Sequence, residues 1–337
     1  MTEVSVIIPV YNNEEFIYKS LQSLKRQVFR NFEAIIINDG STDKTKNIIL
    51  SMIKDDERFK LINIENKGQG IARYIGIKVA RGRYATFLDG DDFVKPTWLS
   101  QMVSDIRIQH ADMVCINYAE YYEKSEKYIK NGFASDSLRM NASDFYKEWC
   151  IDKRLKGFLW NKIFRMDLMK KCNEKLEFSF MEDSYLLLKF LSLSKRIFFD
   201  RSVEYFYRIR KLSTINATYK PEDLVALKKF KSIITFQEKN NPHLKYYFEM
   251  RFLKIELLIL MRMNLKQLQS VDGRELLEDF TLRTWLSRRY LVPFFNKIDT
   301  FIIQGIRGPK SALYFLKMRS YMVQIQRIYR SHKNSAF

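Results

Sequence analysis

Residues 84–96 read YATFLDGDDFVKP, an apolar strand pattern followed by three carboxylates around one glycine. Because Asp89, Asp91 and Asp92 follow the strand so closely, folding brings several negative charges to one strand end, where they repel one another. A divalent cation such as Mg2+ or Mn2+ would offset this repulsion, and such cations usually bind phosphate oxygens as well as carboxylates. The segment therefore indicates a metal-bridged phosphate ligand, and a polar turn is the alternative because Asp and Gly favour turns.

The first hundred residues alternate between strand and helix patterns. Apolar, β-branched runs predict strands at 4–10, 33–37, 60–64 and 84–88, and apolar residues at helical spacing predict helices at 14–27, from 43 onward and at 70–80. Repeated strand–helix units of this length predict a Rossmann-like, mostly parallel sheet with helices on both faces. Ligands of such sheets bind at the carboxyl ends of the strands.

Polar clusters stand at three of these strand ends, at 9–12, 38–41 and 89–92. Asp39 can accept a hydrogen bond from the imide N–H of a uracil ring, and Tyr11 can lie against the base. Arg73, in the loop and helix after the third strand, presents a cation toward the acidic strand end. Alone, Asp39 would be interpreted as a helix cap and Arg73 as a surface cation, but together the clusters indicate a nucleotide site.

Three segments carry a resemblance to a known family: VSVIIPVYNNEEFIYKSLQSLKRQ, FEAIIINDGSTDKT and NKGQGIARYIGIKVARGRYATFLDGDDFVKP. In their order and spacing they resemble the donor-binding half of a family 2 glycosyltransferase with the GT-A fold. The resemblance implies that Asp39 binds uracil, that Asp89 and Asp91 form the DxD motif holding Mn2+ or Mg2+ on the nucleotide diphosphate, and that Arg73 lies near the uridine and diphosphate. The chain departs from many members at Tyr74, which leaves the finer donor contacts open.

The middle of the chain is expected to supply the acceptor side and the catalytic base. Glu182 and Asp183 precede a helical run, where a capping acid pair would suit the helix dipole. Beside the donor half, the pair resembles the family's ED motif, which implies that Asp183 is the general base and that Glu182 orients it. Trp160 is interpreted either as a core aromatic or as a platform on which an acceptor sugar stacks.

Two arginines alternate near the end of this middle region. Arg208 and Arg210 have strand spacing, so they would face one side, either as a solvated strand face or as a lid that clamps the diphosphate. The full predicted set of donor contacts is Pro9, Tyr11, Asp39, Arg73, Asp89, Gly90, Asp91, Arg208, Arg210 and Ser213. Asp91 and Asp89 are the predicted metal ligands, and Trp160 and Asp92 are the predicted acceptor contacts, with a structural role as the alternative for Asp92.

Residues from 221 onward are almost entirely helical in pattern. Helices are predicted near 222–240, 244–270, 273–291 and 309–330. This region holds 21 Lys and Arg against 10 Asp and Glu, so it carries much of the net charge of +19. Its basic, amphipathic last helix is interpreted as part of a bundle on the catalytic domain, as an element of self-association, or as a surface for anionic lipid.

The composition of the chain limits its expected partners and its expected location in the cell. A surplus of positive charge favours an anionic partner, but no nucleic-acid recognition motif is present, so nucleic acid is not an expected partner. Three cysteines without metal-ligand spacing fit a reducing compartment. The N-terminus lacks a signal-peptide pattern, and no apolar run approaches the roughly 18 residues of a spanning helix. We expect a cytoplasmic location, or a peripheral one on the inner face of the plasma membrane.

These observations combine into one prediction. The donor half of a GT-A domain would occupy 1–105, its acceptor and catalytic-base half 106–220, and a basic all-α region 221–337. The resemblance implies an inverting, metal-dependent transfer of a hexose or N-acetylhexosamine from a UDP-sugar to a hydroxyl of a glycan or lipid-linked acceptor. The alternative is a catalytically weak homologue that binds nucleotide sugar and acts as a regulatory or assembly partner.

Overall fold

The computed structural model describes residues 2–123, 127–131, 136–151, 155–176, 178–209, 218–286 and 311. The chain divides into two compact units. One comprises Met1–Trp149 and Lys153–Leu212, and the other Cys150–Asp152 and Ser213–Phe337. The division places residues 213–220 with the helical unit, whereas we predicted a boundary after residue 220.

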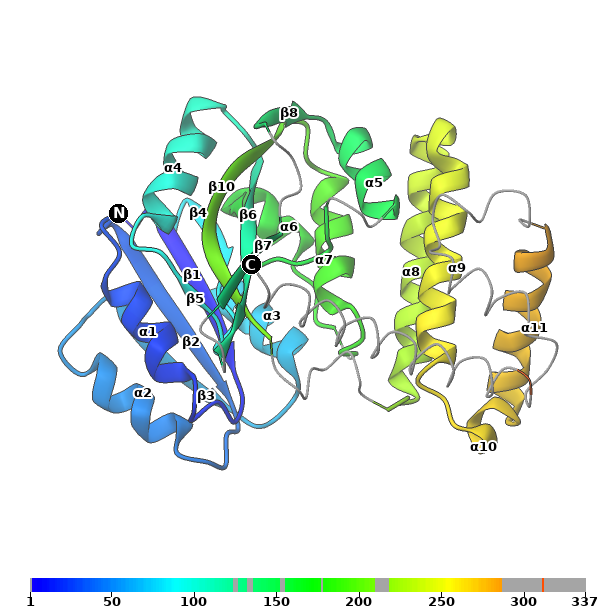
Figure 1. The fold of residues 1–337 in the computed structure, drawn as a ribbon, viewed down its shortest axis with the longest axis horizontal. Coiled ribbons are helices and arrows are strands. Elements are labelled where there is room, and N and C mark those ends of the chain that lie inside the picture. Colours follow the sequence, from blue (N-terminus) through cyan, green and yellow to red (C-terminus); the bar gives the residue numbers. More distant parts are fainter. Residues whose placement is uncertain are drawn as a thin grey trace. The chain divides into compact units, whose positions relative to one another are not determined.

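The first unit is built on one sheet, which has ten strands within the described residues. Its main path runs β3-β2-β1-β4-β9-β6-β10-β5, while β7 pairs with β6 and β8 with β10 (Figure 1). The strands are β1 (Val4–Val10), β2 (Phe32–Asp39), β3 (Phe59–Ile64), β4 (Tyr84–Phe87), β5 (Phe93–Val94), β6 (Met113–Tyr122), β7 (Lys127–Asn131), β8 (Leu138–Met140), β9 (Lys162–Arg165) and β10 (Ile197–Arg208).

The parallel arrangement predicted for the first hundred residues is confirmed. β1 pairs in parallel with both β2 and β4, and β2 pairs in parallel with β3. Val10 lies opposite Asn38, and Ile7 opposite Phe87, so the polar residues that follow these strands gather at one edge of the sheet. The connecting helices are α1 (Ile17–Lys25), α2 (Thr45–Ile53) and α3 (Gln69–Val79).

Antiparallel pairing joins the two predicted halves of the first unit. β9 lies between β4 and β6 and is antiparallel to both, whereas β10 is parallel to β6. The remaining helices of this unit are α4 (Trp98–Ile108), α5 (Ala142–Ile151, which continues into the second unit), α6 (Met166–Cys172) and α7 (Glu182–Leu191). The two predicted halves therefore share one continuous sheet.

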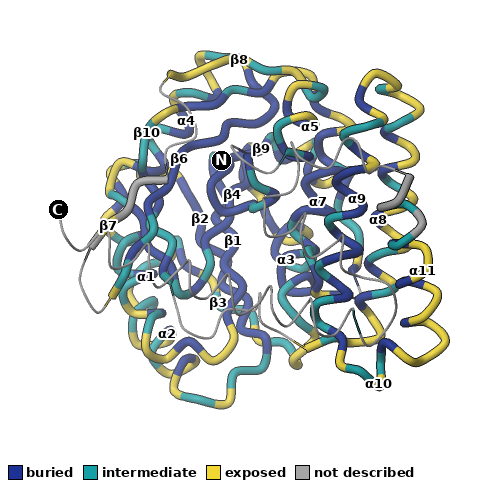
Figure 2. Tube along the Cα trace, turned by 45° about the vertical axis from the view of Figure 1, so that its right-hand side comes forward, coloured by how far each residue is buried: buried dark blue, intermediate teal, exposed yellow. Residues whose placement is uncertain are grey.

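Buried β-branched side chains explain why the central strands form. Every residue of β1 and β2 is buried, as expected for parallel strands covered on both faces (Figure 2). Gly76 allows α3 to pack closely on β1, because a Cβ at this position would lie 2.4 Å from Cγ2 of Ile7. The three cysteines are free and buried, as predicted.

The second unit is helical in the part that the structure describes. It contains α8 (Glu222–Asn240), a 3-10 turn (Pro242–Leu244), α9 (Lys245–Leu260), α10 (Leu265–Leu268) and α11 (Val271–Leu286). The prediction of one helix over 244–270 is wrong, because Asn264 begins a new helix: its side chain accepts a hydrogen bond from the backbone N–H of Gln267 in a capping box. The predicted helix at 309–330 lies outside the described residues, apart from Ser311.

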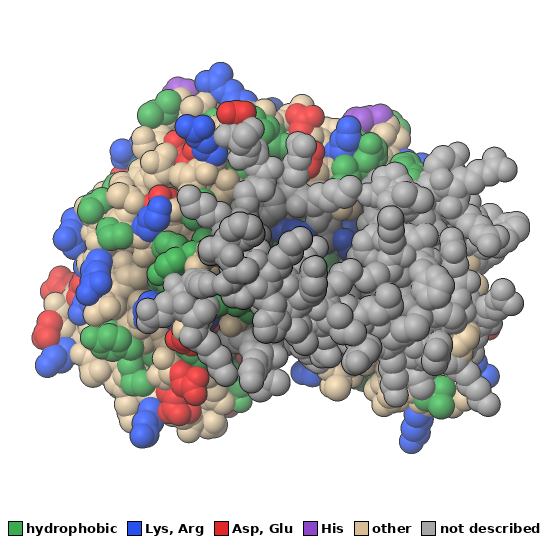
Figure 3. Space-filling model, viewed as in Figure 1, with side chains coloured by type: hydrophobic (Ala, Val, Ile, Leu, Met, Phe, Trp, Pro, Cys, Tyr) green, Lys and Arg blue, Asp and Glu red, His purple; other side chains and the backbone are tan. Residues whose placement is uncertain are grey.

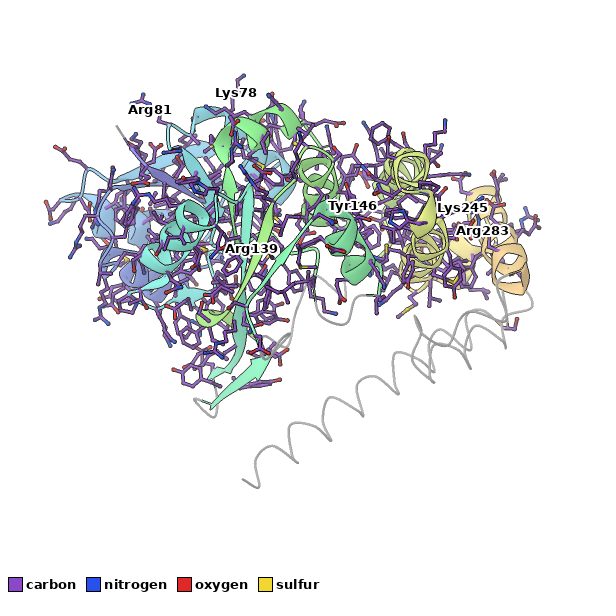
Figure 4. The ribbon with its side chains drawn as sticks, turned by 90° about the horizontal axis from the view of Figure 1, so that it is seen from above. Lys78, Arg81, Arg139, Tyr146, Lys245 and Arg283 are labelled. Atoms are coloured by element: carbon purple, nitrogen blue, oxygen red, sulfur yellow. The ribbon has the colours of Figure 1, made fainter. Side chains whose placement is uncertain are left out.

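Charged side chains are distributed over both units. On the face drawn in Figure 3, Lys and Arg of the described residues alternate with Asp and Glu. Figure 4 places Lys245 on α9 and Arg283 on α11 of the second unit. A search of the described helices found none with the length and apolar character that crossing a bilayer requires.

Candidate active site

Asp39, at the end of β2, binds the loop that leads into α3. Its Oδ1 accepts a hydrogen bond from the backbone N–H of Lys67 and its Oδ2 one from that of Gly68, both at 2.8 Å. The side chain is buried, and Gly68 has a positive φ of 88° that favours glycine. The carboxylate thus fixes the loop, and its remaining lone pairs could accept from a uracil N–H.

Arg73, on α3, connects the acidic strand end to a helix far along the chain. Its Nη2 lies 3.1 Å from Oδ1 of Asp89, and its Nη1 donates to Oε1 of Glu182. Gln69, one turn earlier on α3, also donates to Oδ1 of Asp89, at 3.2 Å. Burial disfavours the charged guanidinium, but Asp89, Glu182 and Asp183 outweigh this and raise the pKa of Arg73.

The predicted acid pair begins α7. Met181, just before it, has a left-handed φ of 55°, which turns the chain sharply into the helix. Glu182 is buried, and burial raises its pKa to about 7 against the opposing effect of Arg73. Asp183 is intermediate in exposure, and burial of its carboxyl group is the main cause that raises its pKa.

Close packing of α3 on α7 brings the acid pair to the donor edge. A Cβ at Gly70 would lie 3.3 Å from Cγ of Glu182 and 3.4 Å from the carbonyl oxygen of Phe178. The structure therefore brings together Asp89, Arg73 and Glu182, which the sequence predicted as parts of one site.

Asp92 is the last residue of the acidic loop, which comprises residues 89–92, and it is fully buried. Its Oδ2 accepts from the hydroxyl of Tyr205 at 2.7 Å, and its Oδ1 from the backbone N–H of Arg208 at 2.8 Å. Burial first, and then the charges of Asp91 and Asp89, raise its pKa well above the usual value. These contacts account for a structural role, the alternative that was kept open beside acceptor binding.

Arg208 is also buried beside this loop. Its Nε donates to the carbonyl oxygen of Asp91 at 2.7 Å, and its Nη1 binds Glu123. With only 2% of its surface exposed, it is not the solvated strand face that alternation allowed, because its donors are used to hold the acidic loop. Its contact with a diphosphate stays a prediction, and Arg210 and Ser213 lie outside the described residues.

The remaining residues that were predicted to contact donor or acceptor differ in how exposed they are. Tyr11 is 46% exposed at the end of β1, where a base could lie against it. Pro9 is buried in β1, and a Cβ added at Gly90 would lie at an ordinary contact distance of 3.5 Å from the carbonyl oxygen of Pro9. Trp160 is 3% exposed, with ring centroids 4.5 Å from Tyr205 and 5.4 Å from Tyr207. Packing accounts for Trp160 without a sugar ligand.

The carboxylates suit a cation that arrives with phosphate. Within the described residues, no group of three or more His, Cys, Asp or Glu side chains could hold a metal ion by itself. Mg2+ and related ions commonly take one or two protein carboxylates and complete their coordination with phosphate oxygens and water. Asp91 and Asp89 supply two carboxylates of this kind, and Oδ1 of Asp89 is the oxygen that Arg73 and Gln69 bind.

Sequence reasoning missed three residues of this region. Gln69 binds Asp89, Tyr205 binds Asp92, and Lys162 is fully buried although it is a lysine. Lys162 carried a usable signal, since it and Asn161 are the only polar residues in the run FLWNKIF. Tyr205 carried none, because its contact joins residues 113 positions apart.

Comparison with known proteins identifies the family of this chain. The family model "Glycosyl transferase family 2" matches residues 5–172. "Putative glycosyltransferase EpsH" of Bacillus subtilis (strain 168) is 30% identical over 251 residues, which cover 73% of this chain and 72% of the relative. The protein is a glycosyltransferase and belongs to glycosyl transferase family 2.

Two further proteins are similar over different extents. The Escherichia coli "UDP-Glc:alpha-D-GlcNAc-diphosphoundecaprenol beta-1,3-glucosyltransferase WfaP" is 37% identical over 136 residues, 40% of this chain and 52% of the relative. The crystal structure of S. aureus TarS 1–349 in complex with UDP-GlcNAc has a TM-score of 0.66 at 18% identity, covering 96% of this chain and 92% of that one. At this identity the likeness shows a shared fold.

Proposed function

We propose that the protein transfers a hexose or N-acetylhexosamine from a UDP-sugar to a hydroxyl group of a glycan or lipid-linked acceptor, with inversion and with Mn2+ or Mg2+. The observation that carries this proposal is the pairing of Arg73 with both Asp89 and Glu182. It connects the strand end expected to hold the diphosphate with the acid pair expected to activate the acceptor.

The similar proteins support the choice of substrates. The TarS structure contains UDP-GlcNAc, and WfaP is named for transfer from UDP-Glc to a diphosphoundecaprenol-linked sugar. Asp39 at the end of β2 and the exposed Tyr11 at the end of β1 suit a uracil ring. We therefore infer a uridine donor for this chain and place a lipid-linked acceptor among the first to test.

Different roles follow from the exposure of the two acidic residues of α7. Asp183 is partly exposed, so it would remove the proton from the acceptor hydroxyl that attacks the anomeric carbon. Glu182 is buried and bound to Arg73, so it would orient the helix end and would not meet substrate. Asp91, with Asp89, would hold the divalent cation, which when bound would offset the charge of the leaving diphosphate.

Release of UDP from a panel of UDP-sugars tests this function without knowledge of the acceptor. Wild-type protein should release UDP slowly from one or two donors with water as the acceptor. Asp183→Asn should keep UDP binding, measured by calorimetry, and lose about 100- to 10,000-fold in kcat. Asp55→Asn is the matched control, because Asp55 has a side chain that is 80% exposed. Turnover of Asp183→Asn within a few-fold of wild type would exclude Asp183 as the base.

Chelation tests the cation separately. Exhaustive treatment with EDTA should abolish UDP release, and added Mn2+ or Mg2+ should restore it. Asp91→Asn should weaken the response to added cation more than Asp89→Asn does. Full activity after chelation would remove the proposed role of both carboxylates.

Cytoplasmic location and attachment to the inner membrane face are proposed from sequence alone. The basic region from 221 onward would supply the lipid-binding surface or an interface for self-association. Flotation with liposomes, with and without anionic lipid, tests the first, and sedimentation of the lipid-free protein tests the second. Absence of binding at low salt would dismiss the membrane proposal.

A further inference from the structure

Lys162, the first residue of β9, has a side chain that is 0% exposed. Its Nζ donates to three oxygens: the carbonyls of Lys156 and Phe158, at 3.1 and 2.5 Å, and Oδ1 of Asn161 at 2.7 Å. Burial lowers the pKa of Lys162, but a protonated lysine has three N–H donors and a neutral one has two, so the three acceptors match the charged form. A buried ammonium is costly unless it is hydrogen-bonded in this way.

Two of the three oxygens that Lys162 binds, the carbonyls of Lys156 and Phe158, belong to the 156–158 loop, which packs on α7. Gly157 stands in the middle of this loop, and an added Cβ would lie 1.8 Å from Oγ and 3.2 Å from Cα of Ser184. No side chain fits there, so the loop backbone lies directly against the residue after Asp183. The backbone N–H of Ser184 in turn donates to Oδ1 of Asp183 at 2.6 Å. A continuous set of contacts therefore leads from Lys162 to the proposed base.

Lys162 also contributes charge near Asp183. Burial raises the pKa of Asp183, whereas Arg73 on α3 and Lys162 on β9 lower it. Two acidic groups complete its charged surroundings: Asp89, which raises the pKa of Asp183, and the neighbouring Glu182. Of the two cations, Arg73 is bound to Asp89 and Glu182, whereas Nζ of Lys162 donates to three uncharged oxygens.

We propose that Lys162 is a positioning residue for sugar transfer: its buried ammonium holds the 156–158 loop against α7, and this contact places Asp183. This inference rests on the proposed role of Asp183 as the base. It assigns no substrate contact to Lys162, since the side chain has no exposed surface.

Three variants of the full chain test the proposal: Lys162→Met, Lys162→Arg and Gly157→Ala. The readouts are UDP binding by calorimetry and kcat for UDP release as a function of pH, with the UDP-sugar that wild type turns over fastest. Lys162→Met should bind UDP within about threefold of wild type and lose about 10- to 100-fold in kcat. The acidic limb of its kcat profile should move to higher pH by about half a unit or more, because a nearby cation is lost.

The other two variants separate charge from placement. Lys162→Arg keeps a cation, so its acidic limb should stay at the wild-type pH even where kcat falls. Gly157→Ala keeps Lys162 and forces the loop away from Ser184, so kcat should fall while KM for the UDP-sugar and the acidic limb stay unchanged. If Lys162→Met does not fold, Lys162→Arg and Gly157→Ala still test the proposal. A kcat equal to that of wild type in Gly157→Ala would overturn it.

Failure of this inference is distinguishable from failure of the proposed function. A kcat for Lys162→Met within threefold of wild type, with an unmoved acidic limb, overturns the positioning role while Asp183→Asn still loses turnover. Equal losses of UDP binding and kcat in Lys162→Met would also overturn it, since they indicate a general structural role. Retained turnover in Asp183→Asn would instead exclude the base itself.

Discussion

Glu182 in the first unit and Glu256 in the second are both buried glutamates with a pKa of about 7, and burial is the largest cause in both. Their surroundings differ. Glu182 is bound to Arg73, which also binds Asp89, whereas Oε1 of Glu256 lies 3.7 Å from Nε of Arg283 and its Oε2 has no hydrogen-bond partner among the described residues. A raised pKa therefore shows only that an acidic side chain is buried. A functional site is indicated when other polar side chains also converge on that acid, as they do on Glu182.

The strongest test of this contrast removes from each unit one arginine that pairs with a buried carboxylate. Arg73→Met leaves Glu182 and Asp89 without their shared cation, so stability should fall by about 3–5 kcal/mol and UDP release by about 100-fold or more. Arg262→Met is the matched control, because Arg262 has a side chain that is 12% exposed and lies 3.3 Å from Asp223. It should lose stability and keep kcat. Urea unfolding and UDP-release assays measure both, and equal kinetic losses would contradict the contrast.

A milder test neutralises the two glutamates. Glu182→Gln keeps the shape of the side chain but weakens the bond to Arg73, so kcat should fall about tenfold as the end of α7 shifts. Glu256→Gln should leave kcat and KM unchanged because no predicted site residue contacts Glu256 in the described structure. Steady-state assays of UDP release measure kcat for both variants. A comparable loss of kcat in both would show that burial of the glutamate, and not its contact with the site, was the relevant property.

The buried carboxyl group of Glu256 should make the stability of the wild-type protein depend on pH in a way that Glu256→Gln does not share. Its pKa of about 7 in the folded chain lies above the ordinary glutamate value of 4.5, so the folded state holds the proton more tightly than the unfolded state does. Stability should fall as the pH rises from about 4.5 to about 7 and then level off, a loss of up to about 3 kcal/mol. Glu256→Gln should thus unfold at a higher temperature than wild type at pH 8 and at a similar one at pH 4.5. Scanning calorimetry at both values tests this, and a lower melting temperature at pH 8 would contradict it.

The smallest effect is expected at Asp105 on α4. Its pKa is raised to about 6 by burial and by the charge of Asp200. The folded state favours the protonated form of Asp105, so the stability of the wild-type protein should fall as the pH rises from about 4 to about 6. Asp105→Asn should therefore be more stable than wild type at pH 7.5 and equally stable near pH 3.5. Because the carboxyl is partly exposed, the gain should be about 0.5–1 kcal/mol. Calorimetry and UDP release should show higher stability with unchanged kinetics.

Agreement between sequence and structure was best where local pattern decides the outcome. The run at 4–10 is β1 at the predicted bounds, and the helix predicted at 222–240 is α8. Errors arose where a polar residue restarts or interrupts a pattern. Asn264 divides a predicted helix into α9 and α10, and the short strand β5 follows the acidic loop without any periodicity to reveal it.

Local sequence was sufficient to place Asp39 and Asp89 at strand ends of one sheet edge, because the period of the apolar residues and the order of parallel strands dictate where each strand stops. Tertiary packing alone decided which side chains meet there. Arg73 reaches Glu182 across 109 positions, Arg208 turns inward to bind the loop at Asp91, and Lys162 loses all contact with solvent. Such contacts depend on how closely helices and sheet approach, as at Gly70 and Gly157, and no short-range pattern encodes that distance.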